Sequence, residues 1–317
     1  MSGEPGEYDV WDLREGRHDF QRLDTELFGT KTKFWFSVDS DPRRWLFKYP
    51  RPGTGEHWAE KIAAELAPLI GLPVARVELA RYQGVVGTAS RSFIPHQYDP
   101  VSHHIRLGEL VHGNELLGDW VTGYDKAKRR GQADHRWANI RKAVEARFPE
   151  SGARPYLAQL VGLIVFDAWI GNTDRHHENW AFLKARQDDP DDIVAVEISV
   201  APSYDHASSL GRELTDARRL ELIRHGRIGQ YVERGRGGIY WDAHAPCGLS
   251  PMALLRRLAQ EDPALAKPWL EKLRALEEAR VILPVDRVPN TCMTAIQKDF
   301  CRAFLRYTMA ELRKVKV

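Results

Sequence analysis

The sequence contains few cysteines and no long apolar run at its start. Its three cysteines, Cys247, Cys292 and Cys301, are odd in number and far apart. Neither a disulfide framework nor a zinc knuckle fits this spacing, so we expect reduced thiols. The N-terminus, MSGEPGEYDVWDLREG, is acidic, is interrupted by glycine and proline, and lacks the apolar stretch of a signal peptide or membrane span. The sequence therefore predicts a cytoplasmic protein without a membrane span.

The chain also lacks a strong net charge. Its 46 Lys and Arg residues nearly balance 44 Asp and Glu residues, which leaves a formal charge of +2. A protein that binds nucleic acid through its overall charge is much more basic, so direct nucleic-acid binding is not predicted. With 317 residues, 43% of them apolar, the chain can bury a large core in two domains or in one bilobal unit.

The first third of the chain has the pattern of strands with one helix. Residues 31–49 contain two aromatic and β-branched runs around the turn residues Ser40–Pro42, which is typical of a β-hairpin. Apolar residues recur every four positions from Glu56 to Ile70 and are followed by glycine and proline, so we expect a helix there. Two further strands are predicted at 74–82 and 85–94.

Beyond His96 the pattern becomes mostly helical. Ser250 followed by Pro251 has the residue types of a helix N-cap and first turn. The polar run Arg186–Asp192 predicts an exposed loop. Apolar residues recur at helical spacing in four stretches, which are Arg136–Arg147, Tyr156–Trp169, Pro251–Ala259 and Asn290–Val315.

This order of elements predicts an α+β fold with two lobes. After an N-terminal segment at residues 1–25, we expect a small strand-rich lobe at residues 26–94 and a larger helical lobe at residues 95–317. The hinge between them is expected at Ser92–Pro95. Two such lobes can leave a cleft between them, where ligands commonly bind.

The segment FDAWIGNTDRHHENWAFL, residues 166–183, carries the most specific signal. An apolar helix is followed there by a polar loop, and a further acid, Asp205, lies downstream in SYDHASSLG. Taken alone, the loop could be an ordinary polar helix cap. The downstream acid favours a catalytic site instead, since two acids and an amide would then converge. The candidate residues within the loop are Asp174, His176 and Asn179.

These residue types suit phosphoryl transfer from ATP. That reaction needs a carboxylate to orient the attacking hydroxyl and oxygen ligands to hold Mg²⁺ against the nucleotide phosphates. Asp174 suits the first role, while Asn179 can supply a neutral carbonyl oxygen and Asp205 an anionic oxygen to the metal. His176 could hydrogen-bond the catalytic carboxylate or the transferred phosphoryl group.

The string D-R-H-x-x-N followed by Y-D resembles the catalytic loop and metal-binding aspartate of the HipA-like serine/threonine kinases. The same D-R-H-x-x-N order is similar to that of the phosphoinositide lipid kinases. The resemblance extends over residues 26–215 and implies a bilobal protein-kinase-like fold with a β-rich N-lobe and a helical C-lobe. It also implies the use of ATP and Mg²⁺ and a serine or threonine acceptor on another protein.

The resemblance also covers the small lobe. EKIAAELAPLIGLPVARVEL is similar to the family's helix and implies Glu60 as the partner of the nucleotide-binding lysine. Backbone groups of Phe93 and Ile94 would contact the adenine edge. FGTKTKFWF resembles the phosphate-covering loop and WLFKYP the strand that carries the lysine, which implies nucleotide contacts by Gly29, Thr30, Lys31, Thr32 and Lys48.

The sequence departs from the family pattern in two places. Full-length members carry an additional N-terminal subdomain, whereas only residues 1–25 precede the phosphate loop here, so the chain resembles a short form. The phosphate loop has Gly29 as its one glycine and lacks the serine-containing segment that full-length members phosphorylate to switch themselves off. Thr30 and Thr32 could serve instead. The family also implies an antitoxin or small companion protein, and no helix-turn-helix of the chain's own is predicted.

Other interpretations of these residues stay open at this point. Glu56 or Glu65 could replace Glu60, which lies away from the apolar stripe of its helix. The acceptor could be a lipid or a small molecule, or the chain could be a pseudokinase that binds nucleotide without turnover. The basic run Lys126–Arg130 is typical of a solvated loop, although it could also dock an acidic substrate. The histidine pairs lack the spacing of a zinc site.

Overall fold

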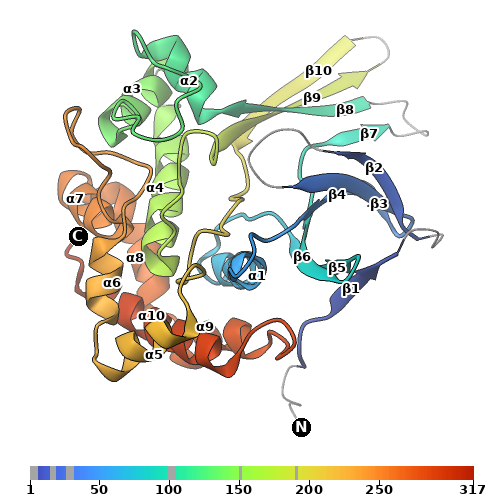
Figure 1. Cartoon of the computed structure of the whole chain (residues 1–317). Coiled ribbons are helices and arrows are strands. Elements are labelled where there is room, and N and C mark those ends of the chain that lie inside the picture. Colours follow the sequence, from blue (N-terminus) through green and yellow to red (C-terminus); the bar gives the residue numbers. More distant parts are fainter. Residues whose placement is uncertain (1–5, 15–18, 26–31, 99–104, 150–151, 190–191) are drawn as a thin grey trace.

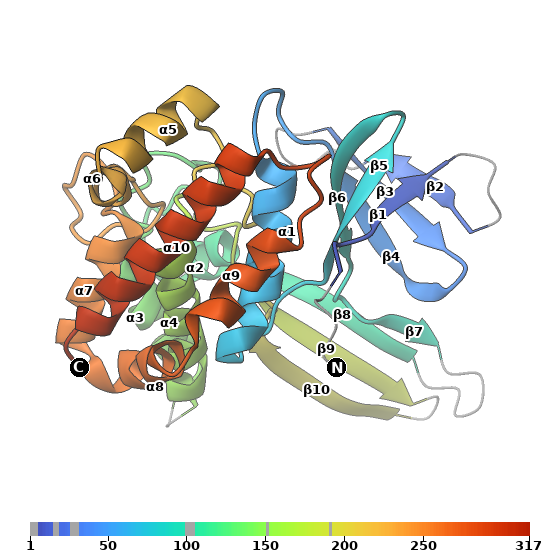
Figure 2. The same cartoon turned by 90° about the horizontal axis from the view of Figure 1, so that it is seen from below.

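The computed structural model describes residues 6–14, 19–25, 32–98, 105–149, 152–189 and 192–317 (Figure 1). A twisted six-stranded sheet forms one side of the molecule, and most of the helices form the other. Seen from below in Figure 2, helix α1 (Glu56–Leu66) lies between the sheet and the helical side. Among the described residues, no helix is both long and apolar enough to cross a membrane.

The six-stranded sheet has the order β1-β5-β6-β4-β3-β2. Strand β1 is parallel to β5, and the other neighbours are antiparallel. Two of its strands come from residues 1–25 and four from the stretch 26–94, while the division of the chain at residues 25 and 94 remains a prediction. The strands are β1 (Val10–Leu13), β2 (Gln21–Thr25), β3 (Lys33–Val38), β4 (Asp41–Lys48), β5 (Val77–Tyr82) and β6 (Val85–Arg91).

The predicted hairpin and helix of the small lobe are confirmed. Strands β3 and β4 pair across a tight turn, and inward-facing aromatic rings such as Phe36 and Phe47 are fully buried, since strand side chains alternate between the two faces. Helix α1 continues into a 3₁₀ turn (Ala67–Ile70) and ends at Gly71, whose φ of 69° is easily adopted by glycine. The predicted strands at 74–82 and 85–94 form the β5–β6 hairpin.

A second sheet lies beside the first and was not predicted from the sequence. Its order is β10-β9-β8-β7, and all neighbours are antiparallel. The prediction of an exposed loop at Arg186–Asp192 is wrong, because residues 186–189 belong to β9 and Asp192 begins β10. A polar composition does not prevent strand formation where both neighbouring strands supply backbone partners. The strands are β7 (His96–Tyr98), β8 (Ile105–His112), β9 (Ala181–Asp189) and β10 (Asp192–Val200).

The helical side is built around α4 (Ala153–Ile170), which packs against α3, α7, α8 and α10. All four helices predicted here are confirmed. Helix α7 begins as expected, because the Ser250 hydroxyl accepts a hydrogen bond from the Ala253 amide and Pro251 occupies the first turn. The other helices are α2 (Gly113–Trp120), α3 (Trp137–Arg147), α5 (Asp216–Arg224), α6 (Ile228–Arg234), α7 (Pro251–Glu261), α8 (Pro263–Arg274), α9 (Glu278–Asp286) and α10 (Ala295–Lys314).

Candidate active site

The polar loop between α4 and β9 is held by the end of the long helix. Gly171, with a φ of 66°, terminates α4 in a left-handed conformation. A Cβ atom at this position would lie 2.5 Å from the Phe304 ring, so only glycine fits the close approach of α10. The Ile170 carbonyl accepts a hydrogen bond from the Leu210 amide, which joins the loop to the segment that follows Asp205.

Arg175 fixes the shape of this loop from below. Its guanidinium donates two hydrogen bonds to the Asp167 carboxylate, at 2.7 and 2.8 Å, and a third to the Asn179 carbonyl at 2.6 Å. A further hydrogen bond of 3.3 Å reaches the Ser203 hydroxyl. Burial favours the neutral form of Arg175, yet the Asp167 carboxylate outweighs it and raises the pKa of the guanidinium. One buried ion pair therefore holds the two ends of the loop in place.

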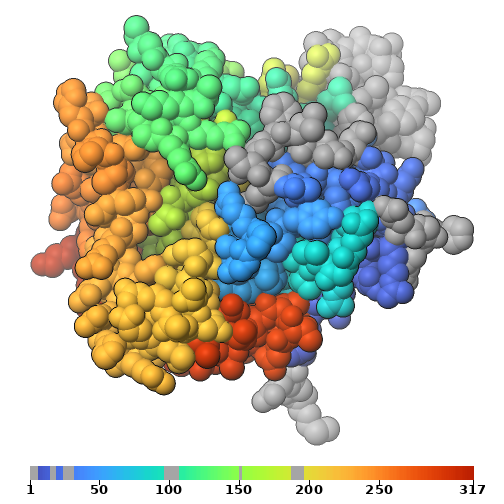
Figure 3. Space-filling view, in the orientation of Figure 1, coloured from blue at the N-terminus to red at the C-terminus, as the bar shows by residue number. Residues whose placement is uncertain are grey.

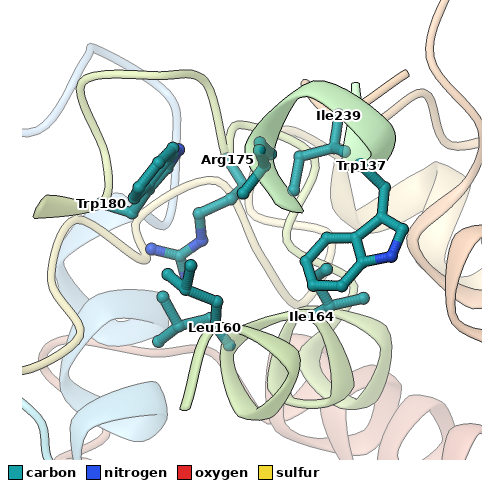
Figure 4. Close-up of a pocket in the computed structure, with 8 residues that line it drawn as sticks. Trp137, Leu160, Ile164, Arg175, Trp180 and Ile239 are labelled. Atoms are coloured by element: carbon teal, nitrogen blue, oxygen red, sulfur yellow. The ribbon is translucent and has the colours of Figure 1, made fainter. Parts of the chain in front are cut away.

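An apolar floor lies under Arg175. Figure 4 shows the Arg175 side chain between Trp180 and Trp137, with Leu160 and Ile164 of α4 beneath it. The small cavity here is lined almost entirely by apolar side chains, so it supports the loop and is not shaped for a nucleotide. Its lining residues are Trp137, Ile140, Leu160, Leu163, Ile164, Arg175, Trp180 and Ile239.

Asp174 lies at the tip of the loop and its side chain is exposed. Its backbone is held on both sides, because its amide donates to the Asn172 side-chain oxygen at 3.1 Å and its carbonyl accepts from the Asn179 side-chain amide at 2.7 Å. The Ser208 hydroxyl lies 3.5 Å from one carboxylate oxygen. Asp174 thus presents its carboxylate to solvent from a fixed backbone, as a residue that orients an acceptor hydroxyl must.

Asn179 is buried and its amide orientation is determined by its partner. The side-chain nitrogen donates to the Asp174 carbonyl, which can only accept, so the side-chain oxygen of Asn179 occupies the other position. That oxygen is an acceptor of the kind that Mg²⁺ binds.

Lys48 lies between two carboxylates from distant parts of the chain. Its Nζ atom is 3.4 Å from Glu60 on α1 and 3.2 Å from Asp205. Burial lowers the pKa of this ammonium group, but the charges of Asp205 and Glu60 outweigh burial and raise the pKa above its ordinary value. Lys48 is therefore a fixed positive charge at neutral pH.

Glu60, not its two alternatives, contacts Lys48. Glu56 instead binds Arg51 and Arg212, at 2.8 and 2.6 Å. Glu65 binds Lys61 at 2.6 Å. Glu60 is only 2% exposed although it lies outside the apolar stripe, because α1 is covered on almost every side.

Asp205 follows the half-buried side chain of Tyr204 and has a left-handed backbone. Its φ of 59° is tolerated by aspartate better than by most residues. The Tyr204 hydroxyl donates to the Glu178 carbonyl at 2.8 Å, which ties the Asp205 segment to the polar loop. Burial raises the pKa of the Tyr204 phenol, so this donor keeps its proton.

The remaining predicted residues lie around this centre. His176 is partly buried, which lowers the pKa of its imidazole, and its Nδ1 atom accepts a hydrogen bond of 3.2 Å from the Glu178 amide. The Phe93 ring lies 5.8 Å from the Tyr204 ring, and Ile94 packs beside Gly108. The Thr32 carbonyl accepts from the Tyr49 amide next to Lys48. Gly29, Thr30 and Lys31 lie outside the described residues.

Comparison with known proteins agrees with this architecture. The Helicobacter pylori serine/threonine-protein kinase CtkA is 24% identical over 176 residues, which cover 53% of this chain and 46% of CtkA. The chain thus spans about half the length of that curated relative. A crystal structure of the Helicobacter pylori proinflammatory kinase CtkA superposes with a TM-score of 0.73 at 18% identity, covering 97% of this chain and 96% of that one.

A second solved structure is similar over most of the chain. HipA, from a Shewanella oneidensis MR-1 complex of HipA, HipB and operator DNA, superposes with a TM-score of 0.55 at 12% identity and covers 98% of this chain and 69% of HipA. At these identities the two structures establish the fold, which is α+β and protein-kinase-like, with a β-rich N-terminal sheet and a helical C-terminal region. The family of HipA-like C-terminal domains matches residues 25–245, more than half of the sequence. The chain therefore belongs to the HipA-like C-terminal domain family.

Proposed function

We propose that this protein transfers the γ-phosphoryl group of ATP to a serine or threonine hydroxyl of a protein substrate. The observation that carries the proposal is the position of Lys48, whose ammonium group lies within 3.4 Å of both Glu60 and Asp205. A charge held in this way is suited to bind nucleotide phosphates. Asp174 lies on the adjacent loop with its carboxylate exposed, where it can orient the acceptor hydroxyl.

The residues present fit a magnesium ion. Mg²⁺ commonly takes one or two oxygens from the protein and the rest from phosphates and water, and the Asn179 side-chain oxygen and the Asp205 carboxylate are such a pair. When bound, the ion neutralises charge on the β- and γ-phosphates. In the described part of the chain, no group of three or more His, Cys, Asp or Glu side chains is placed to hold a metal ion.

The protein's own contribution to the reaction is positioning and electrostatics. Lys48 neutralises charge on the nucleotide phosphates, and Glu60 holds the Lys48 ammonium group in place. Asp174 orients the acceptor hydroxyl for attack. Phe93, Ile94 and Thr32 would line the nucleotide site, together with Gly29, Thr30 and Lys31. His176, whose Nδ1 atom already accepts from the loop backbone, would present its other ring nitrogen to the acceptor side.

The choice of a protein acceptor rests on the relatives. CtkA carries the name serine/threonine-protein kinase, and this chain shares its fold. A lipid or small-molecule acceptor would use the same loop, and a pseudokinase would bind ATP without transferring phosphate. The pseudokinase alternative is disfavoured because Lys48, Asp174, Asn179 and Asp205 are all present.

Incubation of the purified protein with Mg²⁺ and γ-labelled ATP tests the proposal, in the presence of cell lysate or of lipid vesicles. We expect label in protein bands and its loss in the Asp174→Ala and Asp205→Ala variants. Label in the lipid fraction would contradict the proposal that the acceptor is a protein. ATP binding without any transfer would indicate a pseudokinase.

A companion protein of the antitoxin type is a separate proposal. It is supported by the likeness to HipA, whose solved complex also contains HipB. Coexpression with the product of a neighbouring reading frame, followed by size-exclusion chromatography, tests it. Coelution in one complex is expected, and separate elution would contradict it.

A further inference from the structure

A basic segment is attached directly to the catalytic loop. After α2, residues 121–132 form a turn whose one buried aromatic side chain, Tyr124, places its hydroxyl 2.7 Å from Nδ1 of His177. Arg129 of the same segment forms an ion pair of 2.7 Å with Glu178. His177 and Glu178 are consecutive residues between Asp174 and Asn179, so the segment is held at a fixed place beside the candidate active site.

Two cations of this segment remain available for a ligand. Lys128 and Arg130 are exposed, and among the described residues neither forms an ion pair. Glu178, the acidic residue of the catalytic loop that contacts this segment, already forms an ion pair with Arg129. Lys126 is paired with Asp119 at 3.3 Å.

A second basic segment contacts the loop through its glycines. A Cβ atom on Gly238 would lie 2.7 Å from the Arg175 carbonyl, and one on Gly235 would lie 3.3 Å from the Thr173 side chain. Backbone therefore runs directly against the two residues that flank Asp174.

The same segment carries two exposed arginines. The Arg236 guanidinium donates only to backbone carbonyls at 3.3 Å, and Arg234 forms no ion pair within the part of the chain that the structure describes. The nearby acid Glu233 is occupied by Arg256 at 2.7 Å. These arginines are thus as available to a ligand as Lys128 and Arg130.

We refer to Lys128, Arg130, Arg234 and Arg236 as the basic collar. Figure 3 shows the face hollowed between the green part of the chain, which includes residues 121–132, and the gold and orange part, which includes residues 234–238. The first segment contacts His177 and Glu178, and the second contacts Thr173 and Arg175. All four residues belong to the loop that carries Asp174, the residue that would meet an acceptor hydroxyl. The collar therefore borders the place where the substrate chain would pass.

We infer that the basic collar binds acidic side chains flanking the phosphorylated serine or threonine, so that the substrates are acidic polypeptide segments. The inference rests on the proposed function. Carboxylates complement four cations that form no ion pair with any described residue. The new ion pairs would be exposed, so they would select substrates without binding them tightly. A nucleic acid is less favoured, since the overall charge is only +2 and the collar is short.

Three peptides that differ only around one acceptor threonine test this inference, with Glu, Gln or Lys at the flanking positions. Exposed ion pairs contribute roughly 1.4- to 5-fold each, so we expect about a tenfold higher kcat/KM for the Glu peptide than for the Gln peptide. The preference should decrease with added NaCl because salt screens exposed charges. In the variants Lys128→Glu/Arg130→Glu and Arg234→Glu/Arg236→Glu, the Glu-to-Gln ratio should fall at least threefold.

A matched control separates the collar from net charge. Arg224→Glu/Arg280→Glu removes two exposed arginines from α5 and α9 with the same change in charge, and it should keep the preference. Equal rates for all three peptides would overturn the inference and leave the kinase function intact. No transfer to any peptide or protein would overturn both. Tight binding of a labelled RNA oligonucleotide, lost in Lys128→Glu/Arg130→Glu, with no peptide preference would assign the collar to nucleic acid instead.

Discussion

Removal of Arg175 should destabilise the whole protein, because its side chain forms a buried ion pair with Asp167. Its side chain is 3% exposed and that of Asp167 is 5% exposed, and two hydrogen bonds of 2.7 and 2.8 Å join them. Breaking one partner of a buried pair typically costs about 3–5 kcal/mol because the other charge is left in the interior. Arg175→Ala should therefore lower the free energy of unfolding by roughly that amount.

Urea unfolding monitored by circular dichroism measures this change. The control is Arg141→Ala, which removes a partly exposed arginine that pairs with Glu145 at 2.9 Å, and it should cost no more than about 0.5 kcal/mol. A double variant, Arg175→Met/Asp167→Leu, removes both charges and should recover much of the lost stability. A cost below about 1 kcal/mol for Arg175→Ala would refute the reasoning, since it would mean that the pair is accessible to water.

Three further changes probe the site and its surroundings. Lys48→Met should lower phosphoryl transfer by about 10²–10³-fold, in a steady-state assay with labelled ATP, because it removes a fixed charge from the phosphates; an unchanged rate would contradict the role of Lys48. Burial lowers the pKa of His135 to about 3, below the value of roughly 6.5 expected in the unfolded chain, so its contribution to stability is complete above pH 6.5 and is lost as the pH falls toward 3. The urea midpoint should therefore decrease from pH 7 to pH 5, and a smaller decrease is expected in His135→Asn. Ser208→Ala should reduce kcat by about tenfold or less with little change in the KM for ATP, since the hydroxyl, which accepts from the Arg212 guanidinium at 3.0 Å, contacts the Asp174 carboxylate at 3.5 Å; a large rise in that KM would contradict this position.

Local patterns predicted the elements that form from neighbouring residues. The β3–β4 hairpin, α1 and α7 follow from turn residues, apolar spacing and capping residues that lie close together in the sequence. The β7–β10 sheet could not be predicted in the same way. Strand β9 is polar in its second half, residues 184–189, and its pairing with β8 joins segments about seventy residues or more apart, such as Val111 with Phe182.

The candidate site was likewise predicted from the sequence only in part. The order of Lys48, Asp174 and Asp205 along the chain predicted a shared centre, and the 3.2 Å contact between Lys48 and Asp205 joins residues far apart in the sequence. Sequence reasoning passed over Arg175, because an arginine in a polar loop suggests exposure. A signal for its burial was present, since Asp167 interrupts an otherwise apolar helix and a buried acid requires a partner.

The measurement that tests the central claim most directly is phosphoamino-acid analysis of protein labelled with γ-labelled ATP. Wild-type protein, Asp174→Asn and the exposed control Asp299→Asn would be compared at equal ATP occupancy. We predict phosphoserine or phosphothreonine with wild type and the control, and at least a hundredfold less with Asp174→Asn. Equal label in all three proteins, or ATP bound without any phosphoamino acid, would contradict the assignment of this loop as the catalytic centre of a kinase.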